Sequence, residues 1–295
     1  MTMDIIPFSG KILCDEPLML GEGATYDPAT DIAWWFNIKG EALHELHLAS
    51  GRKTVHPLPF LGSVLAVIDP DRQLIASDKG LFIRETASGK LSLLTTLEDI
   101  PANRSNDGRV HPSGSLWVST MARDEAKGAG AIYHVARGTV TRLYAEVSIP
   151  NSICFSPDGS TGYFTDTAIN HLMRVALDPA TGLPAGEPTA ISDETTTSGG
   201  IDGSVCDADG LIWNARYGSG AVDVYRPDGT KIARYTVPAT QTTCPAFIGA
   251  KADRLLVTSS FQGMSDPQRA ADPHAGKTFE LGVTVKGRFE PAYLL

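Results

Sequence analysis

Four oxygen-bearing side chains share one position relative to a turn signal that recurs along the chain. Glu22, Asn106, Asn151 and Asp202 each stand six residues before such a turn. Hard divalent cations such as Ca²⁺, Mg²⁺ and Mn²⁺ prefer carboxylate and amide oxygens, and two carboxylates in a half-buried channel need a cation or raised pKa values. Zn²⁺ can bind oxygens too, but it more often takes His or Cys. The spacing therefore predicts a site for one divalent metal ion.

Three of these residues also have a purely structural interpretation. Asn106-Asp107-Gly108 is typical of a hairpin, Asp202-Gly203 of a tight turn, and Pro150-Asn151 of the start of a turn. Any one of them alone favours the structural interpretation. Four together, at one offset, favour a metal site, because convergent carboxylates mark functional sites. The same offset gives Val64 and Ala246 in the two remaining units.

The turn signal itself predicts the fold. Clusters of Pro, Asp and Gly recur around positions 28, 70, 112, 157, 208 and 252, which lie 42 to 51 residues apart. One short β-rich run precedes each turn and three follow it, as residues 116–120, 131–135 and 139–144 illustrate. Six units of about four strands predict an all-β, six-bladed propeller with four antiparallel strands per blade, as one domain over residues 1–295.

A propeller would bring the four polar residues together. The first strand of each blade lines the central channel, so the starting ends of these strands converge at one mouth. A β-sandwich also has recurring turns, but it would not repeat one internal layout in six long units. Residues 41–48 contain good helix formers, yet the repeat makes them the third strand of the first blade. Residues 262–277 are expected to be a loop between strands.

Composition excludes several classes of protein. The chain has 295 residues, 42% of them hydrophobic, and a net charge of −9, which argues against disorder and against a nucleic-acid partner. It shows no signal-peptide pattern and no run of about 18 apolar residues, so we expect a cytoplasmic protein without a membrane partner. The four cysteines form no CxxC pair, and Cys154 and Cys206 are expected in the core, as are the tryptophans. The sequence contains no G-x-S-x-G nucleophile elbow, which argues against a serine hydrolase.

An ordered set of motifs resembles the senescence-marker-protein/regucalcin/gluconolactonase family from about residue 22 to 279. It comprises Leu20-Gly21-Glu22-Gly23, Arg104-Ser105-Asn106-Asp107-Gly108-Arg109-Val110, Thr120-Met121, Pro150-Asn151, Ser156-Pro157-Asp158-Gly159, Asp202-Gly203 and Thr243-Cys244-Pro245-Ala246-Phe247. The resemblance implies a six-bladed propeller, a single divalent metal and hydrolysis of sugar-acid lactones. The partner would be a small-molecule sugar lactone.

The resemblance also implies a role for each site residue. Glu22, Asn151 and Asp202 match direct metal ligands, and Asn106 matches a residue that faces substrate and metal. Arg104 matches a substrate-binding arginine.

Two assignments go with these roles. Asp124 stands where some members carry a substrate-contacting glutamate, and its shorter side chain could alter substrate choice. Asp202 is our first choice for the general base that assists attack by water.

Three other functions stay open at the level of the sequence. A calcium-handling or regulatory protein would bind metal at the same site without turnover. A propeller used for protein contacts would not need Arg104 beside the metal ring. A metal-dependent esterase or phosphotriesterase would share both the scaffold and the metal.

Overall fold

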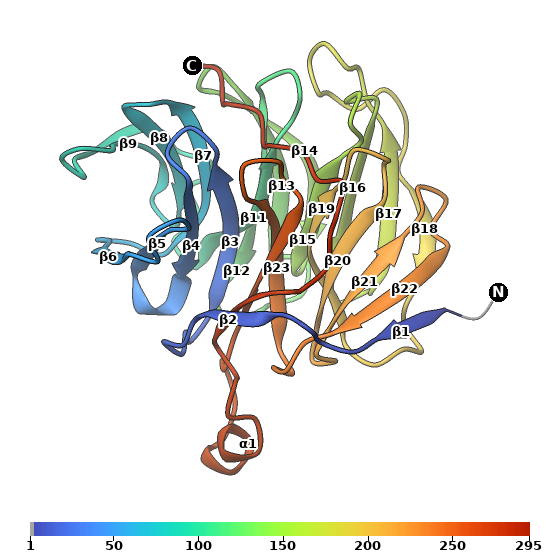
Figure 1. The fold of residues 1–295 in the computed structure, drawn as a ribbon. Coiled ribbons are helices and arrows are strands. Elements are labelled where there is room, and N and C mark those ends of the chain that lie inside the picture. The colour runs from blue at the N-terminus through green and yellow to red at the C-terminus, as the bar shows by residue number, and fades with distance from the viewer. Residues whose placement is uncertain (1–2) are drawn as a thin grey trace.

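The computed structural model describes residues 3–295 and contains six β-sheets that stand around a common axis (Figure 1). The innermost strands of neighbouring sheets contact one another in a closed ring, in the order β3, β7, β11, β15, β19, β23 and back to β3. We number the blades one to six in that order. The predicted six-bladed propeller with four antiparallel strands per blade is confirmed, with β1 as an additional strand of blade five.

The strands follow one another from the channel outward. Blades one to three comprise β3 (Gly21–Asp27), β4 (Ile32–Asn37), β5 (Ala42–His47) and β6 (Lys53–Pro57); β7 (Gly62–Asp69), β8 (Arg72–Ser77), β9 (Gly80–Glu85) and β10 (Leu91–Thr95); and β11 (Asn103–Val110), β12 (Leu116–Ala122), β13 (Gly130–Ala136) and β14 (Thr139–Val147). The helix-like segment at 41–48 is therefore the third strand of blade one, as the repeat predicts.

Blades four to six continue the pattern. They comprise β15 (Pro150–Phe155), β16 (Thr161–Asp166), β17 (His171–Ala176) and β18 (Thr189–Asp193); β19 (Gly200–Cys206), β20 (Ile212–Tyr217), β21 (Ala221–Tyr225) and β22 (Lys231–Thr236); and β23 (Thr242–Ile248), β24 (Arg254–Ser259) and β25 (Thr278–Glu280). A short 3₁₀ helix, η1 (Ile38–Gly40), joins β4 to β5.

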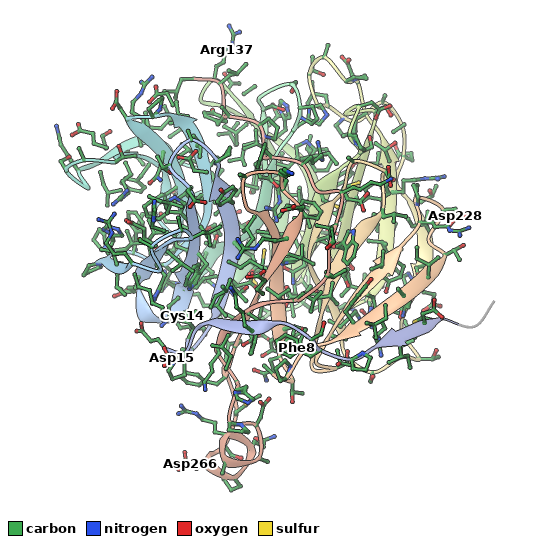
Figure 2. All side chains as sticks on the ribbon, viewed as in Figure 1. Phe8, Cys14, Asp15, Arg137, Asp228 and Asp266 are labelled. Atoms are coloured by element: carbon green, nitrogen blue, oxygen red, sulfur yellow. The ribbon has the colours of Figure 1, made fainter. Side chains whose placement is uncertain are left out.

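The N-terminal segment completes the last two blades. β2 (Lys11–Cys14) pairs antiparallel with β25 as the outermost strand of blade six, and β1 (Asp4–Ile6) pairs parallel with β22 of blade five. Between β1 and β2, Phe8 packs edge-on against Phe279, with ring centroids 5.9 Å apart (Figure 2). Strands from both ends of the chain thus close the ring.

The core lies between successive blades. Trp35, Trp117 and Trp213 are buried there, as are Cys154 and Cys206, as expected; the other two cysteines are also free and buried. The predicted loop after β24 carries a short helix, α1 (Asp266–Ala271), which projects from the body at the end opposite the C-terminus (Figure 1). Within residues 3–295, no helix is both long and apolar enough to cross a membrane.

Candidate metal and substrate site

Every innermost strand carries a β-bulge near its start. In blades one, three, four and five the pairing register shifts between Glu22 and Thr25, Ser105 and Gly108, Asn151 and Cys154, and Ile201 and Ser204. A bulge inserts an extra residue, bends the strand and re-aims the side chains beside it. Glu22 and Asn151 directly precede their bulges, and Asn106 and Asp202 begin theirs. The four predicted residues therefore sit at the same level of the channel.

The bulges correct the positions predicted for blades two and six. Their registers shift between Gly62 and Val64 and between Thr242 and Pro245, so the residues that begin these bulges are Ser63 and Thr243, not Val64 and Ala246. A fixed offset from the turn fails there because the extra residue and the turn lengths differ between blades. The hydroxyls of Ser63 and Thr243 bond neighbouring blades, Ser63 to the hydroxyl of Ser105 at 2.7 Å and Thr243 to the carbonyl of Gly21.

A cavity of about 160 Å³ opens at this level. Its lining residues come from blades one, three, four, five and six: Leu20, Glu22, Arg104, Asn106, Met121, Glu125, Ile149, Asn151, Thr167, Asp202, Tyr217 and Gln262. Five of the six predicted site residues are among them. The sixth, Asp124, is exposed, and its carboxylate accepts a hydrogen bond from the backbone N–H of Ala126 at 3.2 Å. The next residue, Glu125, lines the cavity instead.

The two carboxylates of the ring lie near each other, with Asp202 buried and Glu22 half-buried. Burial, together with the nearby Asp107 carboxylate, raises the pKa of Glu22 to about 8. Burial and the charge of Glu22 hold the pKa of Asp202 well above its usual range. Arg104 lies near both, but burial lowers its own pKa to about 10. Two neighbouring desolvated acids with raised pKa values form a site that favours a bound cation.

A chain of hydrogen bonds runs through the amide side chains of the ring. Nη1 of Arg104 donates to Oδ1 of Asn106 at 2.7 Å, and Nδ2 of Asn106 donates to Oδ1 of Asn151 at 2.8 Å. Nδ2 of Asn151 donates to Oγ1 of Thr167 at 2.9 Å, and that hydroxyl donates to the carbonyl of Ile201 at 2.7 Å. The chain thus joins Arg104 in blade three to the residue before Asp202 in blade five.

The oxygens left free fit a divalent metal. One oxygen of Glu22 accepts from the N–H of Gly23 at 3.1 Å, and one of Asp202 from the N–H of Gly203 at 2.9 Å. The second oxygen of each carboxylate and the second lone pair of Asn151 Oδ1 face no other donor from residues 3–295. In that part of the chain, no three His, Cys, Asp or Glu side chains cluster to hold a metal, so amide oxygens must complete the coordination. Oxygen donors of this kind suit Ca²⁺, Mg²⁺ or Mn²⁺.

The residues that sequence reasoning missed reach the cavity from the ends of second strands. Glu125 follows β12, Thr167 follows β16, Tyr217 ends β20 and Gln262 follows β24. Antiparallel pairing brings the end of each second strand beside the start of the first, as the pairing of Pro150 with Asp166 shows. The end of each second strand was therefore the signal that could have located them.

Sequence and structure comparisons identify the family of the chain. Residues 20–261 match the profile described as the SMP-30/Gluconolactonase/LRE-like region. The chain is 68% identical to a Rhizobium meliloti protein provisionally named a sugar lactone lactonase, over 99% of each chain. It is 34% identical to the L-arabinolactonase of Azospirillum brasilense, over 91% of this chain and 90% of that one.

A crystal structure from Agrobacterium tumefaciens described as a calcium-binding protein, regucalcin, superposes with a TM-score of 0.99 at 62% identity and covers 100% of both chains. The profile match alone covers most of the chain, and the relatives extend it almost from end to end. The chain belongs to the SMP-30/gluconolactonase/LRE-like family.

Proposed function

We propose that this protein is a metal-dependent hydrolase that opens sugar-acid lactones. The observation that carries the proposal is the cavity itself, in which two buried carboxylates with free oxygens face the guanidinium of Arg104 and the amides of Asn106 and Asn151. The lactonase names of the relatives support the substrate class, and the calcium-binding relative supports calcium as one of the cations to test.

Glu22, Asn151 and Asp202 would hold the metal through oxygens contributed by three different blades. When bound, a divalent cation supplies Lewis-acid polarisation of the lactone carbonyl. The hydrogen bond from Arg104 occupies Oδ1 of Asn106, which makes Asn106 better suited to orienting the substrate than to direct coordination. This division agrees with the roles that the family resemblance implies.

The remaining steps belong to the chain's own side chains. Arg104 offers a planar set of donors to the hydroxyl oxygens of a sugar acid. The Asp202 oxygen that accepts from the N–H of Gly203 keeps a second lone pair, which accepts the proton of the water that attacks the carbonyl carbon. The ring C–O bond then breaks, and the proton passes to the leaving ring oxygen, which completes the open sugar acid.

We assign the acidic substrate contact to Glu125 in place of Asp124. Glu125 lines the cavity, whereas the carboxylate of Asp124 is engaged with the backbone of its own turn. The backbone of Glu125 has φ of 61°, in the left-handed region that non-glycine residues rarely occupy, so the exposed side chain reaches the cavity rim from a turn that carries some conformational cost. A wider groove of about 640 Å³ shares Glu125 and leads toward Lys127 and Ile169, which leaves room for larger substrates.

A substrate panel tests this function. Purified protein is assayed against pentono- and hexonolactones, simple aryl esters and phosphotriesters, each with and without chelator and with Ca²⁺, Mg²⁺, Mn²⁺ or Zn²⁺ restored. We expect lactone turnover that the chelator abolishes and the metal restores. Turnover that survives chelation contradicts the metal step. Preference for esters or phosphotriesters contradicts the substrate class, and metal binding without any turnover would instead support a regulatory protein.

A further inference from the structure

Thr167 lies where two blades meet at the cavity. It follows β16 of blade four, and its hydroxyl has two partners: it accepts from Nδ2 of Asn151 at 2.9 Å and donates to the carbonyl of Ile201 at 2.7 Å. Ile201 directly precedes Asp202 in blade five. One hydroxyl therefore contacts a predicted metal ligand and the strand that carries a second one.

The direction of the hydrogen-bond chain is set at both ends. The guanidinium of Arg104 can only donate and the carbonyl of Ile201 can only accept, so each group between them has a single consistent orientation. Asn151 must turn its NH₂ group toward Thr167, and this leaves Oδ1 on the side of Asn106 and the cavity. Reversing the amide would set two NH₂ groups against each other and would leave the Thr167 hydroxyl without its donor.

We propose that Thr167 is a positioning residue that orients the Asn151 oxygen toward the metal and holds the strand of Asp202 in register with it. This inference rests on the proposed metal site. The hydroxyl does not need to touch substrate, because its only proton is already donated to Ile201.

Contacts around Thr167 hold its side chain in one position. Its methyl group lies against Gly200, the first residue of β19, where an added Cβ would come within 2.6 Å of that methyl. The backbone N–H of Ile201 is also bonded from blade four, by Oδ1 of Asn170 at 2.8 Å. Blade four thus bonds both backbone polar groups of Ile201, the residue that leads into Asp202, and Thr167 supplies the bond that also connects to Asn151.

Three variants separate positioning from general stability. Thr167→Val keeps the shape and removes both hydrogen bonds, while Thr167→Ser keeps the hydroxyl. Thr165→Val is the matched control, because Thr165 lies in the same region of blade four, does not line the cavity, and donates a partly buried hydrogen bond to the carbonyl of His171 at 2.7 Å. Chelator-treated proteins are titrated with Ca²⁺ and Mn²⁺ by calorimetry, and kcat and KM for a lactone are measured at saturating metal.

We expect Thr167→Val to weaken metal binding about 10- to 100-fold, the usual effect of removing a group that orients a metal ligand. Thr167→Ser should stay within a few-fold of the wild type. Thr165→Val should lower the melting temperature and leave the metal affinity within about twofold, because it breaks one buried hydrogen bond elsewhere.

Several outcomes overturn the inference. Metal affinity unchanged in Thr167→Val, or equally reduced in Thr165→Val, removes the positioning role. A rise in lactone KM alone would make Thr167 a substrate contact instead. A wild type that binds metal but opens no lactone refutes the proposed function while the affinities still decide the role of Thr167. A wild type that binds neither cation overturns the metal site and this inference together.

Discussion

Glu22 and Asp202 are buried acids whose charges are not balanced by a directly paired cationic side chain. The donors of Arg104 nearest to them go to the carbonyl of Ser105 at 2.9 Å and to Asn106. Burial of an unpaired carboxylate is costly, and the protein offsets it either by protonation or by a bound cation. The stability of the metal-free protein should therefore depend on pH in a way that reports on the site.

The first prediction concerns that dependence. The pKa of Glu22 is about 8 in the folded protein against a usual 4.5, so between these values the folded state holds a proton that the unfolded chain has released. The free energy of unfolding of chelator-treated protein should fall as pH rises through this window, and the contribution should be complete below it. Urea unfolding between pH 4.5 and 8.5 measures it, with Glu22→Gln as the reference.

Two results would contradict this expectation. One is an equal pH slope in the wild type and Glu22→Gln. The other is a failure of Ca²⁺ to stabilise the wild type at pH 8, where a concentration of a hundred times Kd should add about 2.7 kcal/mol.

A second prediction concerns the proposed general base. Asp202→Asn should reduce kcat for the preferred lactone by about 10²- to 10⁴-fold, the usual contribution of general base catalysis, and should weaken metal binding as well. Asp158→Asn is the control, because Asp158 is exposed and bonded within its own turn to Ser156 and Ser160. Equal activity of both variants and the wild type would remove Asp202 from the mechanism.

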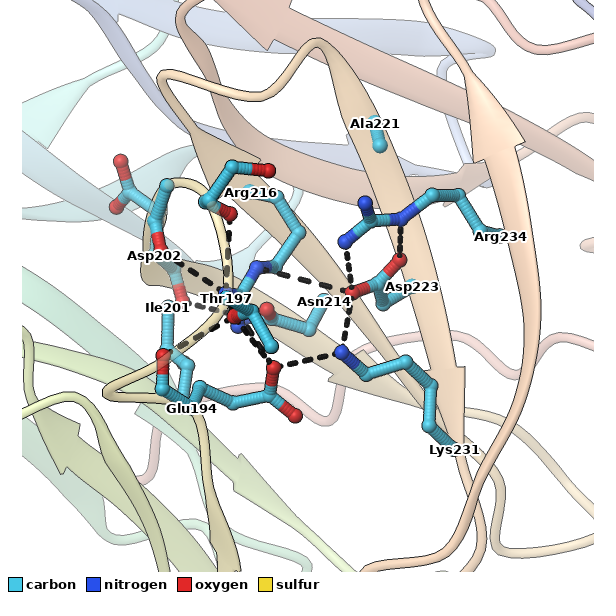
Figure 3. A network of polar contacts seen from close by, with 12 residues as sticks. Glu194, Thr197, Ile201, Asp202, Asn214, Arg216, Ala221, Asp223, Lys231 and Arg234 are labelled. Carbon is cyan, nitrogen blue, oxygen red and sulfur yellow. Dashed lines mark hydrogen bonds and ion pairs between the residues drawn. The ribbon is translucent and has the colours of Figure 1, made fainter. Parts of the chain in front are cut away.

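At the scale of elements, a network of charged side chains lies on the outer strands of blade five, the blade whose first strand carries Asp202 (Figure 3). The fully buried carboxylate of Asp223 lies 2.6 Å from Arg234, 3.1 Å from Lys231 and 3.7 Å from Arg216. The guanidinium of Arg216 in turn donates to the hydroxyl of Thr197 at 2.7 Å, in the loop between β18 and β19. Blade five therefore holds that loop through its second and third strands.

The same element supports the bulge at Asp202 directly. Nδ2 of Asn214, in β20, donates to the carbonyl of Asp202 at 2.8 Å and to the hydroxyl of Ser204 at 3.0 Å (Figure 3). Bulge carbonyls lack a regular ladder partner, so a buried amide that bonds them keeps the strand in its bent form. The position of Asp202 thus depends on a neighbouring strand as well as on its own.

The third prediction tests the charge network. Asp223→Ala leaves Arg216, whose side chain is 0% exposed, without its carboxylate partner in β21, and should lower the free energy of unfolding by about 3–5 kcal/mol. Asp228→Ala is the control in the same blade, since Asp228 is exposed in a turn, and should cost no more than about 0.5 kcal/mol. Chemical unfolding compares them, and equal losses would show that the network contributes nothing specific.

At the scale of the molecule, the two chain ends close the propeller in different ways. The N-terminal β2 supplies the outer strand of blade six, so the last blade is completed by the first part of the chain. The C-terminal segment crosses several blades: Arg288 donates to the carbonyl of Phe155 at 2.6 Å, and the N–H of Tyr293 donates to the carbonyl of Val67 at 2.8 Å.

Side chains occupy the channel below the level of Glu22, Asn106, Asn151 and Asp202. Arg109 reaches from blade three to the carbonyls of Ala24 in blade one and Ser204 in blade five, at 3.3 and 3.2 Å. Glu290 of the C-terminal segment pairs with it at 3.3 Å. We therefore expect substrate to enter from the mouth that carries the four site residues.

The fourth prediction concerns the closure by the N-terminal strands. Deleting residues 1–14 exposes the edge of β25 and removes the buried Cys14, so the melting temperature should fall by roughly 2–4 °C for each kcal/mol lost. Deleting residues 1–6 removes only β1 and should cost less. Differential scanning calorimetry compares the two deletions, and an equal effect would show that β2 has no special part in closing the ring.

Local turn chemistry made the architecture readable from the sequence. Pro, Asp and Gly favour turns through local backbone conformation. The recurrence of such turns, as at positions 70, 157 and 208, therefore predicted six units without any knowledge of long-range contacts. The same local repetition located the ring, because the number of residues that separates Glu22 or Asp202 from the following turn can be read directly from the sequence. The sequence by itself thus determined the propeller and the four residues at its mouth.

The tertiary structure decided which atoms meet. Whether Asp124 or Glu125 lines the cavity depends on the dihedral angles of one tight turn, and Val64 and Ala246 were misplaced because the bulges and the turn lengths differ between blades. The contact of Thr167 with Asn151 and Ile201 joins different strands and different blades. Such contacts follow from strand pairing and from closure of the ring, which act between residues far apart in the chain and leave no local pattern in it.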